Sequence, residues 1–148
     1  MAESQPFLRV LIIEDDARRV EQLCAWLEAD VRPVVAAGPG RALGILSRDR
    51  GTVYAGILLD QDIQSPDASS GEETFGENAV VESIVANVSR DVPILVHSMN
   101  SRLAPEMVER LLRAGFSVTR IPMTHLTREA LAEWMGEVRD SAEVRDGR

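Results

Sequence analysis

The sequence contains no lysine, so all 16 of its basic residues are arginine. This absence excludes Walker-type phosphate loops, Schiff-base chemistry and a lysine general base, because each of them needs a primary amine. A single cysteine, Cys24, excludes an internal disulfide and a zinc site built from several cysteines, although a disulfide between two chains stays open. The only histidines are His97 and His125.

Long apolar runs and an excess of basic charge are missing as well. No uncharged apolar run approaches the roughly 18 residues of a membrane-spanning helix, and residues 1–6 have no basic start followed by an apolar stretch. We therefore expect a cytoplasmic protein that does not bind membranes. The net charge of −8 repels polyphosphate on average, so general nucleic-acid binding is not expected.

Length and composition favour one globular domain. The chain has 148 residues, of which 45% are hydrophobic and 27% are charged, values that are typical of soluble domains. We expect a disordered N-terminus over residues 1–6, a single domain over 7–138, and a charged, frayed tail over 139–148.

Short apolar runs alternate with helical patterns along the chain. The runs predict strands at 8–13, 31–37, 53–59, 92–96 and 117–121, and apolar residues at helical spacing predict helices at 17–29, 40–48, 80–88, 103–112 and 126–138. Pro33 suits an edge strand, and Gly115 is placed to cap a helix. This alternation predicts an α/β fold, a three-layer sandwich around a parallel sheet.

Acidic and polar residues follow the predicted strands. Glu14 and Asp15 follow the first strand, and Asp60 follows the third. With the strand order 2-1-3-4-5 these carboxylates converge, and two such charges about 5 Å apart repel by roughly 3 kcal/mol at an effective dielectric of 20. A bound cation reverses that sign, and a site of oxygen ligands favours Mg²⁺, or Mn²⁺, over zinc.

Three segments resemble the signatures of two-component receiver domains: 9–16 (RVLIIEDD), 57–60 (ILLD) and 92–98 (VPILVHS). The resemblance covers residues 8 to about 138 and implies a flavodoxin-like receiver fold. It also implies that Glu14 and Asp15 bind magnesium, that Asp60 accepts a phosphoryl group, and that the backbone carbonyl of Asp62 binds the metal. By the same resemblance, Ser98 hydrogen-bonds a phosphoryl oxygen.

The family's lysine before the proline of the fifth strand is absent, because Ile121 stands there. The neighbouring Arg120 replaces it only if the strand end twists, since adjacent strand residues point to opposite faces. The segments 59–62 (LDQD), 97–100 (HSMN) and 120–123 (RIPM) are instead similar to the cyclic-phosphate processing receiver domain group. That group implies a metal site turned toward a cyclic phosphate.

Three functions follow as hypotheses. In the first, Asp60 takes a phosphoryl group from a histidine kinase, and the domain signals to a protein effector in trans. In the second, slightly favoured, the domain is a cyclic-phosphate-processing enzyme: Asp15, Asp60 and Asp62 hold the metal, and His97 moves a proton. There Ser98 and Asn100 position the phosphate, Arg120 or Arg102 offsets its charge, and the polar loop 63–76 covers the substrate.

The third hypothesis is a pseudo-receiver that acts only as a protein-interaction module and uses none of these residues chemically. Each residue also has a structural interpretation. Asp16 and its acidic neighbours stabilise the start of the helix that follows, because negative charge is favourable there. His97 is then a strand-end histidine, Asn100 a turn residue and Arg120 a solvated arginine.

Overall fold

The computed structural model of the chain describes residues 7–64, 79–98 and 106–145. Strands and helices alternate through these residues. The strands are β1 (Leu8–Ile13), β2 (Val31–Ala36), β3 (Gly56–Asp60), β4 (Ile94–Ser98) and β5 (Val118–Pro122). The helices are α1 (Ala17–Trp26), α2 (Pro39–Ser47), α3 (Ala79–Asn87), α4 (Glu106–Arg113) and α5 (Arg128–Arg145), with two 3₁₀ helices, η1 (Gln61–Gln64) and η2 (Met123–His125).

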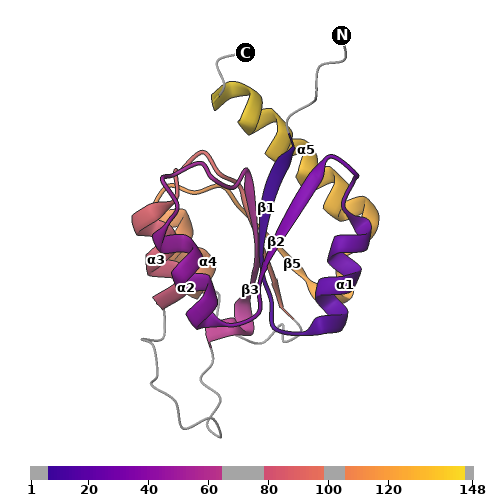
Figure 1. Ribbon diagram of the computed structural model, residues 1–148, viewed down its shortest axis with the longest axis horizontal. Coiled ribbons are helices and arrows are strands. Elements are labelled where there is room, and N and C mark those ends of the chain that lie inside the picture. Colours follow the sequence, from indigo (N-terminus) through magenta and orange to yellow (C-terminus); the bar gives the residue numbers. More distant parts are fainter. Residues whose placement is uncertain (1–6, 65–78, 99–105, 146–148) are drawn as a thin grey trace, which may run out of the picture.

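All five strands are parallel and lie in the order β2-β1-β3-β4-β5, which confirms the predicted sheet. Helices α1 and α5 cover one face, and α2, α3 and α4 cover the other (Figure 1). The predicted three-layer sandwich is therefore confirmed. No helix within the described ranges combines the length and the apolar composition needed to cross a membrane.

Alternate residues of the central strands supply two separate cores. Leu11 and Ile57 pack with α2, α3 and α4, whereas Ile12 and Leu58 pack with α1 and α5. This alternation follows from the two-residue period of a strand. It also decides which side of the sheet each residue at a strand end occupies.

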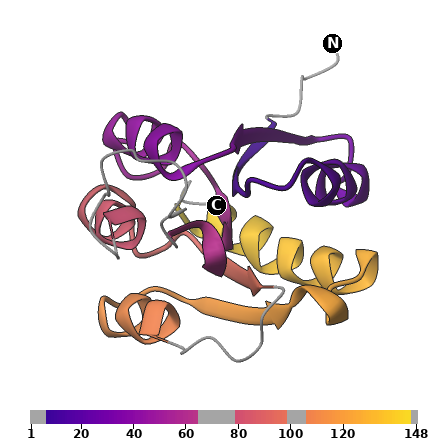
Figure 2. The same ribbon diagram turned by 90° about the horizontal axis from the view of Figure 1, so that it is seen from below.

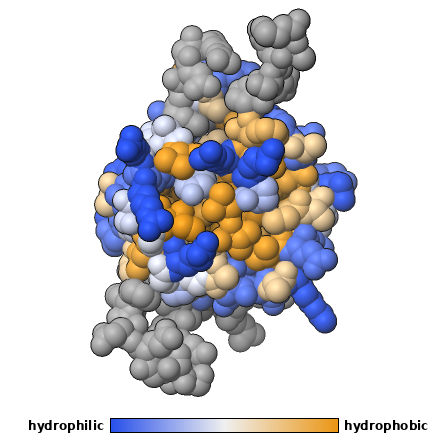
Figure 3. Space-filling view, in the orientation of Figure 1, coloured by the Kyte–Doolittle hydropathy of each residue, from blue (hydrophilic) through white to orange (hydrophobic). Residues whose placement is uncertain are grey.

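Strand β2 forms one edge of the sheet, as Pro33 predicts. The carbonyls of Asp30 and Ala36 accept hydrogen bonds from β1, so the even-numbered residues face that neighbour and the odd-numbered ones face away. The ring nitrogen of Pro33 therefore lies on the open edge, where no donor is lost. Figure 3 shows apolar residues at the centre of the side of the molecule that Figure 1 views. In β2 itself, Val34 and Val35 are partly buried.

Helix α5 continues to Arg145, beyond residue 138, where the apolar spacing in the sequence ends. Ion pairs support the extension: Arg139 donates hydrogen bonds to Asp30 and to Glu28, in the segment between α1 and β2. The expected frayed tail is thus helical over most of its length, because its charges have partners that the sequence does not reveal. Residues 1–6 and 146–148 lie outside the described ranges.

Strands β3, β4 and β5 end later than the apolar runs predict. Asp60 and His97 are opposite each other in the β3–β4 ladder, and Ser98 is the last residue of β4. Polar side chains stay in the ladder here because backbone hydrogen bonding does not depend on the side chain. Figure 2 views the molecule from this carboxyl edge of the sheet, where η1 follows β3.

Candidate functional site

Three ionisable side chains form a row across the carboxyl edge of the sheet. In the β3–β4 ladder, Asp60 pairs with His97. In the β1–β3 ladder, Ile13 pairs with Leu59, so the residues that follow them, Glu14 and Asp60, come next to each other. Strand residues two positions apart point to the same face of the sheet. Ile12 and Leu58, two positions before Glu14 and Asp60, pack in the core under α1 and α5, so the row lies on that face. Folding thus brings residues from β1, β3 and β4 to one place.

Glu14 has no exposed surface and is bound by the first turn of α1. Arg19 donates from Nε to Oε1 at 2.8 Å and from Nη2 to Oε2 at 3.0 Å, and the Asp16 backbone N–H donates to Oε2 at 2.9 Å. Burial by itself raises the pKa of Glu14, but these hydrogen bonds outweigh it and the pKa falls below its usual value. Glu14 is therefore a buried carboxylate whose charge is matched by Arg19.

Asp16 serves as the N-cap of α1, where its Oδ1 accepts hydrogen bonds from the backbone N–H groups of Arg18 and Arg19. This is the structural role that the sequence left open for it. The cap fixes the start of the helix, and with it the position from which Arg19 reaches Glu14.

Asp60 is 1% exposed, and its two carboxylate oxygens differ in their hydrogen bonding. Its Oδ1 accepts a hydrogen bond from the Asp62 backbone N–H at 2.9 Å, while its buried Oδ2 has no hydrogen-bond partner among the residues that the structure describes. Arg19 Nη2 lies 3.9 Å from Oδ2. Burial raises the pKa of Asp60 to about 8, and the nearby charge of Glu14 acts in the same direction, whereas the Asp62 N–H opposes it.

His97 completes the row and is also 1% exposed. Its Nδ1 lies 3.6 Å from Glu14 Oε1, and within the described parts of the chain its buried Nε2 has no hydrogen-bond partner. Burial lowers the pKa of His97 to about 4, although the Glu14 charge opposes this shift. The ring is therefore neutral at physiological pH, which is the form that binds metals.

The donor set of the row fits a divalent cation. One ligand atom from each of Glu14, Asp60 and His97 lies within 4.8 Å of the other two. Two buried polar atoms, Asp60 Oδ2 and His97 Nε2, lack partners in residues 7–64, 79–98 and 106–145, and buried polar groups without partners are rare. A cation bound here would accept electron pairs from such atoms and offset the Glu14 charge, which adds to the effect of burial on the pKa of Asp60.

The other predicted metal ligands lie around this row. The Asp15 side chain is 61% exposed, and its Oδ1 is 3.9 Å from Arg19 Nη2, so the structure leaves it outside the buried cluster. Burial and the neighbouring Glu14 raise the pKa of Asp15. Asp62 is half-buried, and its Oδ2 accepts a long hydrogen bond of 3.4 Å from Ser98 Oγ.

The predicted phosphate-binding residues are only partly described. Arg120 is exposed and donates from Nε to Gln61 Oε1 at 3.4 Å, so its side chain reaches the end of β3. Ile121 is opposite His97 and packs against the core under α1 and α5, where it extends the row with an apolar side chain. Asn100, Arg102 and the loop from residue 65 to residue 76 lie outside the described residues.

Arg19 is the site residue that sequence reasoning missed. It belongs to the arginine-rich polar face of α1, and nothing in its spacing marks it from Arg18 beside it. One signal was present: Asp16 is a strong N-cap residue, and a cap there places residue 19 in the first turn, directly above the strand end. That signal indicates a position but not the partner, because the direction of a long side chain depends on tertiary packing.

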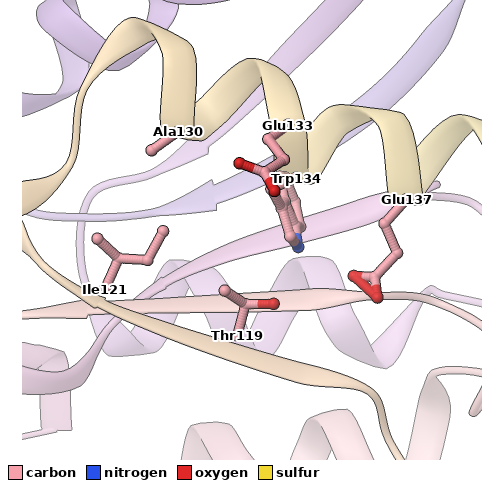
Figure 4. A pocket seen from close by; sticks show the side chains of 6 residues that line it. All are labelled: Thr119, Ile121, Ala130, Glu133, Trp134 and Glu137. Atoms are coloured by element: carbon pink, nitrogen blue, oxygen red, sulfur yellow. The ribbon is translucent and has the colours of Figure 1, made fainter.

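A hollow lies between α5 and β5 (Figure 4). Its volume is about 320 Å³. Thr119 and Ile121 of β5 line one side, and the indole of Trp134 lies opposite, with Glu133 and Glu137 along α5. It has no histidine and no facing pair of buried carboxylates, so the chemistry of the row is not repeated there.

Several solved structures similar to this chain are receiver domains of response regulators or sensor kinases. The receiver domain of a sensor histidine kinase from Pseudomonas aeruginosa PAO1, solved with a magnesium ion in its active-site cleft, has a TM-score of 0.63 and 21% identity, covering 87% of this chain and 94% of that one. The signal receiver domain of a putative Luxo repressor protein from Vibrio parahaemolyticus has a TM-score of 0.67 and 13% identity, covering 95% of both chains.

The chemotaxis protein CheY4 from Vibrio cholerae is similar as well, with a TM-score of 0.62 and 16% identity over 89% of this chain and 98% of that one. The sequence matches no protein-family model and no curated protein at a significant level. At these identities the likeness establishes the fold, a flavodoxin-like receiver fold. The cyclic-phosphate processing group receives no support from these comparisons.

Proposed function

We propose that this receiver-like domain handles phosphate at Asp60, with a divalent cation held by Glu14 and Asp60 and with His97 at the edge of the same site. The observation that carries the proposal is Asp60 Oδ2, a buried carboxylate oxygen at the end of the central strand that has no hydrogen-bond partner in the described portion of the chain. In receiver domains, which this sequence resembles, the equivalent aspartate is the phosphoryl acceptor.

Phosphoryl acceptance by Asp60 is the function that the geometry supports best. Oδ1 is held by the Asp62 N–H, which leaves Oδ2 to attack phosphorus while the donor leaves with the bonding electrons. Mg²⁺, when bound, would neutralise charge on the transferring oxygens. Ser98, whose hydroxyl lies beside Asp62 Oδ2, is placed at the end of β4 to donate a hydrogen bond to a phosphoryl oxygen.

The missing lysine of β5 needs a substitute, and Arg19 is better placed than Arg120. Its Nη2 is 3.9 Å from Asp60 Oδ2, whereas the described hydrogen bond of Arg120 goes to Gln61. A guanidinium offsets phosphate charge through a planar fork rather than a point charge. We therefore assign to Arg19 the charge compensation beside Asp60 before the metal binds, and the phosphodonor role to a histidine kinase or a small acyl phosphate.

His97 favours a second candidate, the processing of a cyclic phosphate. A neutral buried imidazole at the end of a row that also holds Glu14 and Asp60 is suited to take a proton from an attacking water or to bind a metal through nitrogen. Phosphoryl acceptance alone does not require a histidine at this position. The substrate in this case is a cyclic phosphodiester, and Asp60 is a metal ligand rather than a covalent acceptor.

One experiment distinguishes these functions. The protein is incubated with acetyl phosphate and Mg²⁺, and separately with 2′,3′-cyclic nucleotides and Mg²⁺, alongside Asp60→Asn and His97→Gln. A covalent phosphoryl adduct seen by mass spectrometry, absent in Asp60→Asn and retained in His97→Gln, supports phosphoryl acceptance. Ring opening that needs both residues supports the second candidate. If neither reaction occurs, the domain acts by binding an effector protein, and the proposal is wrong.

A further inference from the structure

Arg19 occupies the acidic row as a cation would. Its guanidinium binds both carboxylate oxygens of Glu14 and lies 3.9 Å from Oδ2 of Asp60. The charge of this guanidinium is held firmly, because the Glu14 hydrogen bonds raise the pKa of Arg19 further above its usual value. The row thus carries its own positive charge in the state described by the structure.

The oxygens that Arg19 binds are the same oxygens that a metal ion would need. Both Oε1 and Oε2 of Glu14 accept hydrogen bonds from the guanidinium, and Oε1 is also the atom that faces His97. A divalent ion bound to Glu14 and Asp60 would lie within a few ångströms of the guanidinium, and like charges at that distance repel strongly when poorly solvated. Guanidinium and metal therefore compete for Glu14.

We propose that Arg19 is a built-in counterion of the divalent site: it binds Glu14 when the metal is absent, and it has to leave Glu14 for the metal to bind. This inference rests on the proposed function in placing a divalent site at Glu14 and Asp60. Arg19 then sets the affinity of the site, because every metal-binding event includes the loss of its paired hydrogen bonds.

The structure offers the displaced guanidinium a place to go. Arg19 Nη1 is 3.6 Å from Asp16 Oδ2, and Nη2 is 3.9 Å from Asp15 Oδ1. Both of these carboxylates are largely exposed, with side-chain exposures of 61% for Asp15 and 41% for Asp16. A change of rotamer in a side chain that is already 22% exposed can therefore exchange a buried partner for solvated ones without moving α1.

The test compares Arg19→Gln with Arg18→Gln. Arg18 is exposed on the same turn of α1, so its replacement removes one positive charge without touching Glu14. Mg²⁺ affinity is measured by isothermal titration calorimetry on both variants, the wild type and Asp60→Asn. We expect Arg19→Gln to bind Mg²⁺ on the order of tenfold more tightly than Arg18→Gln, because charge-assisted hydrogen bonds of this kind no longer have to be broken.

Thermal unfolding supplies a second readout, since Arg19→Gln leaves Glu14 without its partner. In EDTA this variant should melt below Arg18→Gln, and in Mg²⁺ its melting temperature should rise by more. Arg19→Lys covers the case in which Arg19→Gln does not fold: a single ammonium cannot bind both oxygens in the same planar fork, so its Mg²⁺ affinity should also exceed that of the wild type.

Two results overturn the inference, and they differ in what else they affect. If Mg²⁺ binds the wild type and not Asp60→Asn, but Arg19→Gln has the affinity of Arg18→Gln or a weaker one, the metal site stands and the role of Arg19 is wrong. If neither the wild type nor the Arg19 variants bind Mg²⁺, the divalent site of the proposed function fails together with this inference.

Discussion

Replacing Asp60 with asparagine should reverse its effect on stability between acid and alkaline pH. The pKa of Asp60 is raised to about 8 in the folded protein, against about 3.9 in an unfolded chain. Between these values the folded state keeps a proton that the unfolded state has released. The free energy of unfolding therefore falls as pH rises through this window, and the loss is complete above pH 8.

The size of this loss follows from the shift. At about 1.4 kcal/mol for each pKa unit, the difference amounts to a ceiling of about 6 kcal/mol at alkaline pH. Asparagine does not ionise, but its amide brings a buried donor that costs about 1–3 kcal/mol without an acceptor. We expect Asp60→Asn to be less stable than the wild type near pH 4 and about 2 kcal/mol more stable above pH 8, with the two curves crossing between.

Urea unfolding at a series of pH values, in EDTA, measures this crossing. Asp140→Asn, which replaces an exposed carboxylate of α5, serves as the control and should show no crossing. Glu14 and His97 also titrate, but they are present in both proteins and largely cancel in the difference. The prediction is wrong if the difference in the free energy of unfolding between the wild type and Asp60→Asn stays constant from pH 4 to pH 9. It is also wrong if Asp60→Asn is less stable than the wild type at every pH.

Two further changes probe the row and the core beside it. The pKa of His97 is lowered to about 4, so its contribution to the free energy of unfolding is fully present above about pH 6.5 and is lost as pH falls. The wild type should therefore lose about 2 kcal/mol between pH 7 and pH 4.5 that His97→Gln does not lose, as measured by urea unfolding at the two pH values. Gly56→Ala places a Cβ 2.9 Å from both Trp134 and Val138, so it should lower the free energy of unfolding by about 1–3 kcal/mol. Gly136→Ala, which meets nothing within 4 Å, is its control and should be neutral or stabilising in the same denaturant assay, and equal losses would contradict the packing argument.

Most of the fold could be predicted because local signals and the global arrangement agree. The apolar run of β1 and the proline of β2 each point to one position in a parallel sheet, and the sheet has that order. The ends of elements were harder to predict. Asp60 and His97 belong to the strands although they are polar, and α5 continues past its apolar stripe because Arg139 finds partners near β2.

The site could be predicted only in outline. Residues at the ends of parallel strands must converge, so the carboxylates that follow β1 were expected to meet Asp60, with Asp15 as the one facing it. Which member of the pair 14–15 is buried depends on how the chain turns into α1, and the structure buries Glu14 and exposes Asp15. The arginine that binds Glu14 comes from a helix face with several arginines, and only tertiary packing selects Arg19.

The central claim is that Glu14 and Asp60 share a divalent cation. A crystal structure of the protein soaked in Mn²⁺, with Mn²⁺ as an anomalous scatterer in place of Mg²⁺, tests it most directly. The account predicts an anomalous peak between the Glu14 and Asp60 carboxylates, with the Arg19 guanidinium turned away from Glu14. Arg19 still bound to both oxygens of Glu14, with no peak beside Asp60 at saturating Mn²⁺, would contradict it.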